Sequence, residues 1–172
     1  LKQDFTPAAD GKVTLNSATT LDTEQGNFCQ VKGTLAPSIG FEVNLPLTHW
    51  SQRYLQLGCG GLCGSLNLNL GNAHTCAPAL RGEFVVASTD MGHSGSMMDA
   101  SWADDPQKRI DFAYRAHHQT ARIAKALIHA FYGQQPRYAY FMGCSDGGRE
   151  ALMAAQRFPE DFDGITAGAP AA

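Results

Sequence analysis

The sequence lacks the hallmarks of several broad classes of protein. Charged residues make up only 17% of its 172 residues, and the formal net charge is −3. It has no internal repeat, no low-complexity stretch and no apolar run near the roughly 18 residues that a membrane-spanning helix needs. A disordered tail and a basic nucleic-acid-binding protein are therefore excluded, and we expect neither nucleic acid nor a membrane as a partner. Hydrophobic residues, at 44%, suffice for the buried core of one domain.

Cysteine is scarce and its number is odd. The C-x3-C spacing of Cys59 and Cys63 raises the question of zinc, but nearby His74 lacks the paired-histidine spacing of a zinc finger. We therefore expect disulfides, as in an exported protein, and no metal site in this chain. One cysteine is then left without a partner in these residues. The five cysteines are Cys29, Cys59, Cys63, Cys76 and Cys144.

Hydrophobic patterning predicts an α/β domain. Alternating polar and apolar residues predict antiparallel strands in the first quarter of the chain. Apolar residues at spacings of three and four then predict a long helix, and from there strands and helices alternate, which is typical of a mostly parallel sheet covered on both faces. The expected strands are 12–36, 40–46, 53–57, 83–88, 138–142 and 162–167, and the expected helices are 108–132 and 147–158.

One segment carries the pattern of a catalytic nucleophile. Gly143-x-Ser145-x-Gly147 matches the nucleophile elbow, and Ser145 falls between a predicted strand and a predicted helix, which is the setting that this motif requires. The turn is so sharp that the serine adopts a strained backbone and the residues two before and two after it must lack a Cβ. An ordinary glycine-rich turn with a capping serine is the alternative.

Two sets of backbone amides are candidates for an oxyanion hole. The amide of Asp146 begins the helix after Ser145 and faces any negative charge that develops there. The glycine-rich loop 58–64, which follows a predicted strand, is expected to supply the second donor from Gly61, with Gly60 next to it. The alternative is a disulfide-braced turn without a catalytic role.

Other polar residues are weaker candidates for the functional site. Asp90 and His93 lie in the loop after strand 83–88 and are candidates for the substrate-site loop, although local hydrogen bonds would explain them equally well. Arg149 and Glu150, at the start of the elbow helix, are candidates for contact with substrate, but a structural ion pair is the favoured interpretation. All six histidines precede Ser145, whereas the motif's usual order places the acid and the histidine after it. The general base is thus expected outside this chain.

The motifs together resemble the tannase/feruloyl esterase family. The resemblance spans most of residues 28–171, and its Cys-Ser-x-Gly-Gly-Arg core is highly specific. The matching segments are 143–151 (GCSDGGREA), 156–165 (QRFPEDFDGI) and 167–171 (AGAPA), with 28–29 (FC), 58–64 (GCGGLCG), 90–93 (DMGH) and 111–115 (DFAYR) upstream.

The resemblance implies an α/β-hydrolase with an inserted lid. It also implies that the protein is secreted or periplasmic. It implies that Ser145 is the nucleophile and that Cys144 bonds to a cysteine beside the catalytic histidine, outside this chain. The resemblance also implies that Cys29 pairs with Cys63, and Cys59 with Cys76. Residues 1–172 would then be the N-terminal part of the catalytic domain. The catalytic Asp and His, the lid and its structural calcium would lie beyond them, in the rest of the enzyme or in a second chain.

The resemblance also implies the reaction. We expect a serine esterase that hydrolyses aromatic esters of the feruloyl type through an acyl-enzyme, on small esters that can be attached to plant cell-wall polysaccharide, with no cofactor for the chemistry. A tannase acting on gallate esters is one alternative. A non-catalytic, hydrolase-like binding fragment is another, because this chain lacks the base.

Overall fold

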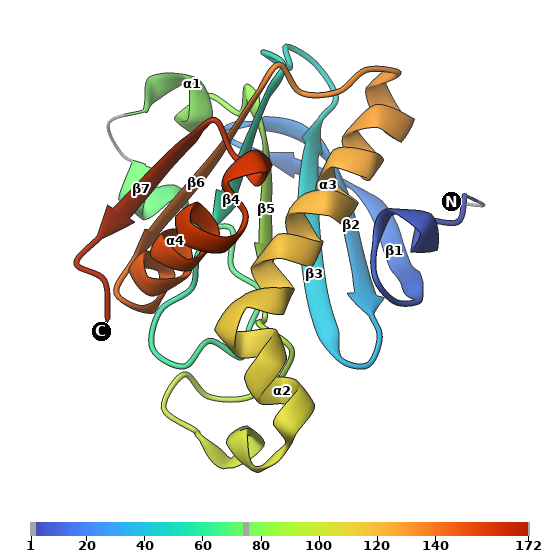
Figure 1. Cartoon of the computed structure of the whole chain (residues 1–172). Coiled ribbons are helices and arrows are strands. Elements are labelled where there is room, and N and C mark those ends of the chain that lie inside the picture. The colour runs from blue at the N-terminus through green and yellow to red at the C-terminus, as the bar shows by residue number, and fades with distance from the viewer. Residues whose placement is uncertain (1–2, 74–75, 172) are drawn as a thin grey trace.

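The computed structural model describes residues 3–73 and 76–171. Within these residues, seven strands form one sheet in the order β1-β2-β3-β5-β4-β6-β7 (Figure 1). Each predicted strand is present within a few residues of its expected bounds. The strands are β1 (Val13–Thr23), β2 (Gly26–Leu35), β3 (Ile39–Pro46), β4 (Arg53–Leu57), β5 (Phe84–Thr89), β6 (Tyr138–Cys144) and β7 (Gly164–Gly168).

The sheet has an antiparallel half and a parallel half. β1, β2 and β3 form consecutive hairpins, and β3 pairs antiparallel with β5. From β5 onward the pairs β5–β4, β4–β6 and β6–β7 are all parallel. The carboxyl ends of β4 and β6 therefore meet at one edge of the sheet, and the loops that follow them lie next to each other.

The long predicted helix is present, with an irregularity near its start. It runs continuously through α2 (Pro106–Ile110), a π-helical turn (Asp111–Arg115) and α3 (Ala116–Tyr132), and it ends at Gly133 in the left-handed region. The other helices are α1 (Ala77–Leu80), α4 (Asp146–Arg157) and short 3₁₀ turns at Thr6–Ala8, Leu70–Ala73, Ser101–Asp104 and Pro159–Asp161. None of the helices in the described residues has both the length and the hydrophobicity needed to cross a membrane.

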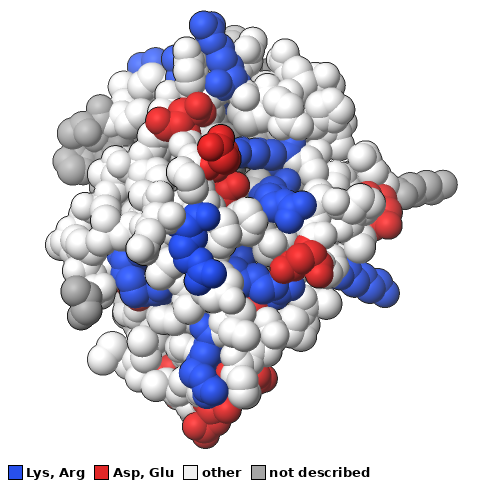
Figure 2. Space-filling model, viewed as in Figure 1, with Lys and Arg blue, Asp and Glu red and all other residues white. Residues whose placement is uncertain are grey.

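The two faces of the sheet are covered differently. α3 and α4 pack across one face, where Tyr54, Phe41 and Phe141 are fully buried in the main core (Figure 1). Within the described residues, α1 and the 68–70 segment cover part of the other face, where they pack on a smaller cluster around Leu55 and Phe84. A groove of about 580 Å³ remains open along β4, β6 and β7 on that face. On the helical face, acidic and basic side chains are interspersed among uncharged ones (Figure 2).

The imidazole ring of His117 is buried in the interior of the fold. Its ring is fully buried on α3 and meets Phe141 and Phe158 edge-on, at centroid distances of 6.2 and 5.9 Å. Neither ring nitrogen has a hydrogen-bond partner among the described residues. Burial, followed by the charges of Arg149 and other nearby bases, lowers the pKa of His117 from 6.5 to about 3. The folded protein therefore keeps this imidazole neutral.

We expect His117 to make the fold sensitive to acid. Between pH 6.5 and about 3 the unfolded chain binds a proton that folded His117 excludes, so stability present above pH 6.5 is lost as the pH falls, at up to about 1.4 kcal/mol per pH unit. Chemical denaturation across this range should show a shallower loss in His117→Leu than in the wild type. His129→Leu, on the exposed side of the same helix, should keep the wild-type slope. Equal slopes for His117→Leu and the wild type would contradict this assignment.

Candidate active site

Ser145 is the single residue between the end of β6 and the start of α4, where the elbow motif places it. Its backbone lies in the strained left-handed half of conformational space, with φ 61° and ψ −119°, and its side chain is exposed. Its amide donates to the carbonyl of Gly168 at 3.0 Å, and its carbonyl accepts from Ala171 at 2.9 Å. The end of β7 thus holds the strained residue in place.

The glycines around Ser145 make room for two different neighbours. A Cβ on Gly143 would collide with the backbone of Gly147, as the elbow motif predicts. A Cβ on Gly147 would instead lie 2.8 Å from the carbonyl oxygen of Cys59 and 2.9 Å from the carbonyl carbon of Gly58. The second glycine of the motif is therefore required by the glycine-rich loop that packs on α4.

Backbone hydrogen bonds tie the start of the glycine-rich loop to the elbow. The amide of Gly58 donates to the carbonyl of Met142 at 2.9 Å, and the amide of Gly147 donates to the carbonyl of Cys59 at 2.7 Å. The amide of Cys59 donates to Oε1 of Glu150 at 3.1 Å. The loop and the elbow consequently form one rigid unit, although almost ninety residues separate them in the sequence.

Three amides of this unit make no hydrogen bond within the described part of the chain. They belong to Gly60, Gly61 and Asp146, the residues that the sequence suggests as oxyanion donors. Gly61 has φ 58°, and a Cβ there would lie 2.7 Å from the carbonyl oxygen of Met97. Glycine is thus needed at this position for both conformation and space. Gly60, Gly61 and Ser145 are all exposed.

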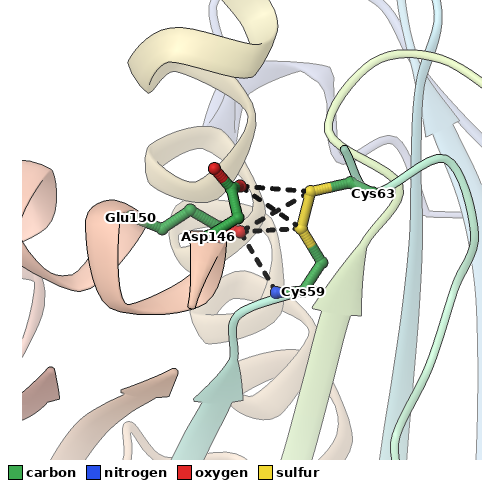
Figure 3. A group of neighbouring side chains, drawn as sticks. All are labelled: Cys59, Cys63, Asp146 and Glu150. Atoms are coloured by element: carbon green, nitrogen blue, oxygen red, sulfur yellow. Dashed lines mark hydrogen bonds between the residues drawn. A yellow bond between two sulfur atoms is a disulfide. The ribbon is translucent and has the colours of Figure 1, made fainter. Parts of the chain in front are cut away.

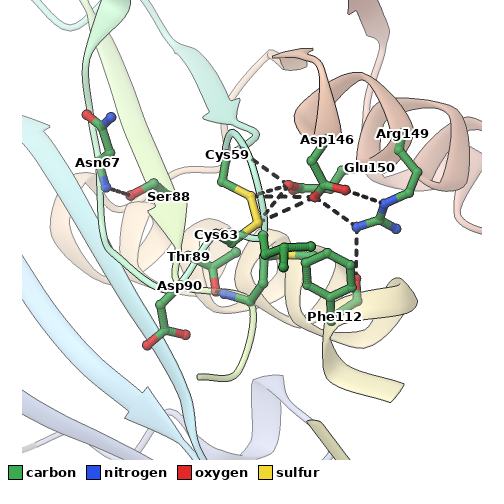
Figure 4. Close-up of a disulfide and its surroundings, with 12 residues drawn as sticks. Cys59, Cys63, Asn67, Ser88, Thr89, Asp90, Phe112, Asp146, Arg149 and Glu150 are labelled. Atoms are coloured by element: carbon green, nitrogen blue, oxygen red, sulfur yellow. Dashed lines mark hydrogen bonds and ion pairs between the residues drawn. A yellow bond between two sulfur atoms is a disulfide. The ribbon is translucent and has the colours of Figure 1, made fainter. Parts of the chain in front are cut away.

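Asp90 and His93, the two candidates for the substrate-site loop, hydrogen-bond to backbone groups of neighbouring segments. Asp90 accepts from the amides of Gly40 and Gly92 at 2.9 Å each, and burial raises its pKa to about 6. Figure 4 shows its carboxylate pointing away from the glycine-rich loop. His93 is buried against Trp102 and bonds through Nε2 to the carbonyl of Leu62 at 2.8 Å. It therefore braces the glycine-rich loop from behind.

The cysteine pairing inferred from the family is wrong. Cys59 and Cys63 are bonded to each other, with their Cα atoms 5.4 Å apart, so the expected Cys29–Cys63 and Cys59–Cys76 bonds are absent (Figure 4). Cys29 packs into the core under α3, whereas Cys76 packs on the opposite face of the sheet. Both are unbonded, because the two cysteines of the glycine-rich loop are bonded to each other.

The expected ion pair of Arg149 and Glu150 is also wrong. Arg149 binds both carboxylate oxygens of Asp146, at 2.6 and 3.0 Å, while Glu150 turns inward toward the disulfide (Figure 3). Glu150 is fully buried, and its burial raises its pKa from 4.5 to about 8. The signal that could have located it is the spacing of Asp146 and Glu150, which puts both on one face of α4.

The described histidines do not supply a base for Ser145. His117 is in the core, and Nδ1 of His118 pairs with Asp161 at 2.6 Å. His93 is engaged by the glycine-rich loop, and His49 precedes β4 at the opposite end of the sheet from Ser145. His129 is in the last turn of α3, exposed to solvent. His74 lies outside the described residues.

Comparisons with known proteins agree on one family. The family profile described as tannase and feruloyl esterase matches residues 23–172. An uncharacterized esterase of Xanthomonas campestris is 43% identical over 93% of this chain, and the mono(2-hydroxyethyl) terephthalate hydrolase of Piscinibacter sakaiensis is 36% identical over 83%. The chain spans only 28% and 26% of the lengths of these two relatives.

A solved structure confirms the expected fold class. The crystal structure of feruloyl esterase B from Aspergillus oryzae matches 96% of this chain with a TM-score of 0.80 and 28% identity, and 38% of that chain is covered. The mixed sheet and its helices are thus an α/β-hydrolase-like portion of a longer fold.

We expect the elbow to tolerate no side chain at Gly143. Gly143→Ala would push a Cβ into the backbone of Gly147, so the variant should lose at least about 2 kcal/mol of stability, or about 4–8 °C of Tm. Gly60→Ala is the matched control, because a Cβ there meets nothing within 4 Å. Thermal unfolding followed by circular dichroism would measure both. Equal Tm values for the two variants would contradict the packing described here.

Proposed function

The chain belongs to the tannase and feruloyl esterase family, and from this premise we propose that it is the nucleophile-bearing part of a serine esterase acting on aromatic carboxylic esters of the feruloyl type. One observation carries the proposal. An exposed serine in a strained strand-to-helix turn is followed directly by the amide of Asp146, and the glycine-rich loop tied to that turn carries the amides of Gly60 and Gly61; no other group of the described chain engages these three amides. Unengaged amides near a nucleophile are the components of an oxyanion hole.

In the first half of the proposed reaction, Ser145 Oγ attacks the ester carbonyl carbon. A histidine outside residues 1–172 takes the hydroxyl proton, and the carbonyl oxygen becomes an oxyanion held by the amides of Asp146 and of Gly61 or Gly60. The C–O bond to the alcohol then breaks, and the histidine returns its proton to the departing alcohol. The product is an acyl-enzyme on Ser145.

In the second half, water replaces the alcohol. The same histidine takes a proton from water as the water oxygen attacks the acyl carbon. The second tetrahedral intermediate then collapses, the bond from the acyl carbon to Ser145 Oγ breaks, and the histidine returns its proton to Oγ, which frees the aromatic acid and restores the serine hydroxyl. Because Ser145 is held in its strained conformation throughout, the oxyanion donors need no rearrangement between the two halves.

The aromatic acyl group is supported by the names of the relatives. Proteins 34–38% identical to this chain are named probable feruloyl esterases, and the Piscinibacter sakaiensis relative is named for a terephthalate ester. Both names describe esters of aromatic acids. We therefore place a small aromatic ester, free or on plant cell-wall polysaccharide, as the substrate and a secreted or periplasmic location as its setting.

The remaining parts of the proposed enzyme lie outside these residues. Cys144 is exposed and unbonded beside Ser145, which suits a disulfide to a cysteine next to the catalytic histidine. The structural calcium is assigned to the lid. The Cys59–Cys63–Asp146–Glu150 cluster is a poor match for calcium, since calcium takes six to eight oxygen ligands and two of these four ligands are sulfur.

Removing the Ser145 hydroxyl should abolish catalysis by the protein that contains this chain. We expect Ser145→Ala to lower kcat on methyl ferulate by at least about 10³-fold, leaving only binding and oxyanion effects. Ser17→Ala, on the exposed strand β1, should keep wild-type activity. A fluorophosphonate probe should label wild-type Ser145 and not the alanine variant. Retention of more than about a tenth of the activity would refute the nucleophile, and preference for methyl gallate would make the enzyme a tannase.

The pairing of Cys144 can be tested independently of activity. We expect non-reducing peptide mapping of the protein that contains this chain to find Cys144 bonded to a cysteine outside residues 1–172. The bond would join the nucleophile strand to the segment that carries the histidine. Cys29 and Cys76 serve as internal controls and should be alkylated without reduction, because both are unbonded here. A freely alkylated Cys144 would refute the proposal.

A further inference from the structure

Four side chains from two distant segments converge beneath the glycine-rich loop. Cys59 and Cys63 come from that loop, and Asp146 and Glu150 come from the first turns of α4 (Figure 3). Their sulfur and carboxylate oxygen atoms all lie within 4.8 Å of one another. Cys63, Asp146 and Glu150 are buried, and Cys59 is half-buried. We call these four residues the thiol–carboxylate cluster.

Three of the four sulfur–oxygen distances in the cluster fall in the range of the edges of a small tetrahedron, while the two sulfur atoms are bonded to each other. Sγ of Cys59 lies 2.9 Å from Oε1 of Glu150 and 3.6 Å from Oδ2 of Asp146. Sγ of Cys63 lies 3.4 Å from Oδ2 of Asp146 and 3.8 Å from Oε1 of Glu150. A tetrahedral zinc ion with bonds of about 2.0–2.3 Å has ligand–ligand edges of about 3.3–3.8 Å. Three of the four cross distances already lie in that range, and the fourth is slightly shorter.

The second carboxylate oxygen of Glu150 also indicates a missing ligand. Among the described residues, Oε2 has no hydrogen-bond partner, although Glu150 is fully buried and its Oε1 contacts the sulfur of Cys59. Arg149 cannot supply the partner, because its guanidinium is committed to Asp146 and to the carbonyls of Ala113 and Phe112. A buried carboxylate oxygen without a partner is costly, and a cation bound beside it would remove that cost.

We propose that the reduced thiol–carboxylate cluster is a binding site for a zinc-like divalent cation. A dithiol or phosphine reductant supplies two electrons, and with two protons the Cys59–Cys63 bond becomes two thiols while the reductant is oxidised. The cation then takes the place of the thiol protons, which pass to solvent. For a cation to bind all four ligands, the two sulfur atoms must move apart, and breaking the disulfide allows them to do so.

The surroundings of the cluster suit such an ion. Arg149 hydrogen-bonds Asp146, and the amide of Cys59 hydrogen-bonds Glu150, so both carboxylates are oriented by outer partners as metal ligands usually are. Two thiolates and two carboxylates around a divalent ion leave a charge of −2, as in a four-cysteine zinc site, and Arg149 offsets part of it. The expectation of no metal site, drawn from histidine spacing, did not anticipate these carboxylates.

The test uses cobalt as a spectroscopic substitute for zinc. The full chain, reduced with a phosphine, should bind one equivalent of Co²⁺ with the near-ultraviolet absorption of cobalt–thiolate bonds, and Zn²⁺ should displace it. The oxidised chain should not bind. Cys63→Ser should abolish the absorption, and Glu150→Gln should weaken binding at least about 10-fold. Cys29→Ser and Cys76→Ser are matched controls and should bind as the wild type does.

A second measurement needs no variant. In the reduced wild-type chain, Zn²⁺ should slow the alkylation of Cys59 and Cys63 at least about 10-fold while leaving Cys29 and Cys76 unprotected, as mass spectrometry would show. Absence of Co²⁺ binding by the reduced chain, equal protection of all cysteines, or unchanged affinity in Glu150→Gln would overturn the proposal. The readouts are metal binding and alkylation, so the outcome does not depend on esterase activity.

Discussion

The close contact between the glycine-rich loop and the first turn of α4 is the constraint on which the rest of this structure depends. A Cβ on Gly58 would lie 2.6 Å from Cα of Gly147, so the two backbones touch with no side chain between them. That contact allows the hydrogen bond from Gly147 to Cys59. It also holds the loop that carries the unengaged amides of Gly60 and Gly61 against the elbow.

The contact in turn depends on the order of strands in the sheet. β4 and β6 are parallel neighbours, so the loop after one and the helix after the other emerge side by side at the same edge. The strained backbone of Ser145 costs about 1–3 kcal/mol, which the surrounding hydrogen bonds to Gly168 and Ala171 offset. The antiparallel strands β1 to β3 are remote from this edge and extend the sheet under α3.

The same contact creates an unusual electrostatic environment under the loop. Asp146 and Glu150 lie one turn apart on α4 but have opposite surroundings, since Asp146 is neutralised by Arg149 and Glu150 is enclosed by the disulfide and the core. Burial raises the pKa of Glu150 to about 8, so this carboxyl is neutral under mildly acidic conditions. A protonated carboxyl suits contact with a disulfide, and an ionised one suits a cation.

The sequence by itself determined the elements, because each depends on local periodicity. The strand 53–57 is present with its predicted bounds, the helix over 108–132 is continuous, and Ser145 lies at its strand-to-helix turn. Gly143 was predictable for the same reason, because its close contact with Gly147 is local, whereas the need for glycine at 147 comes from the distant glycine-rich loop. Only the tertiary structure decided that Cys59 bonds to Cys63, that Arg149 pairs with Asp146, and that Glu150 turns inward. These pairings depend on which segments the sheet brings together, and residues far apart in the chain carry no periodic signal of their neighbours in space.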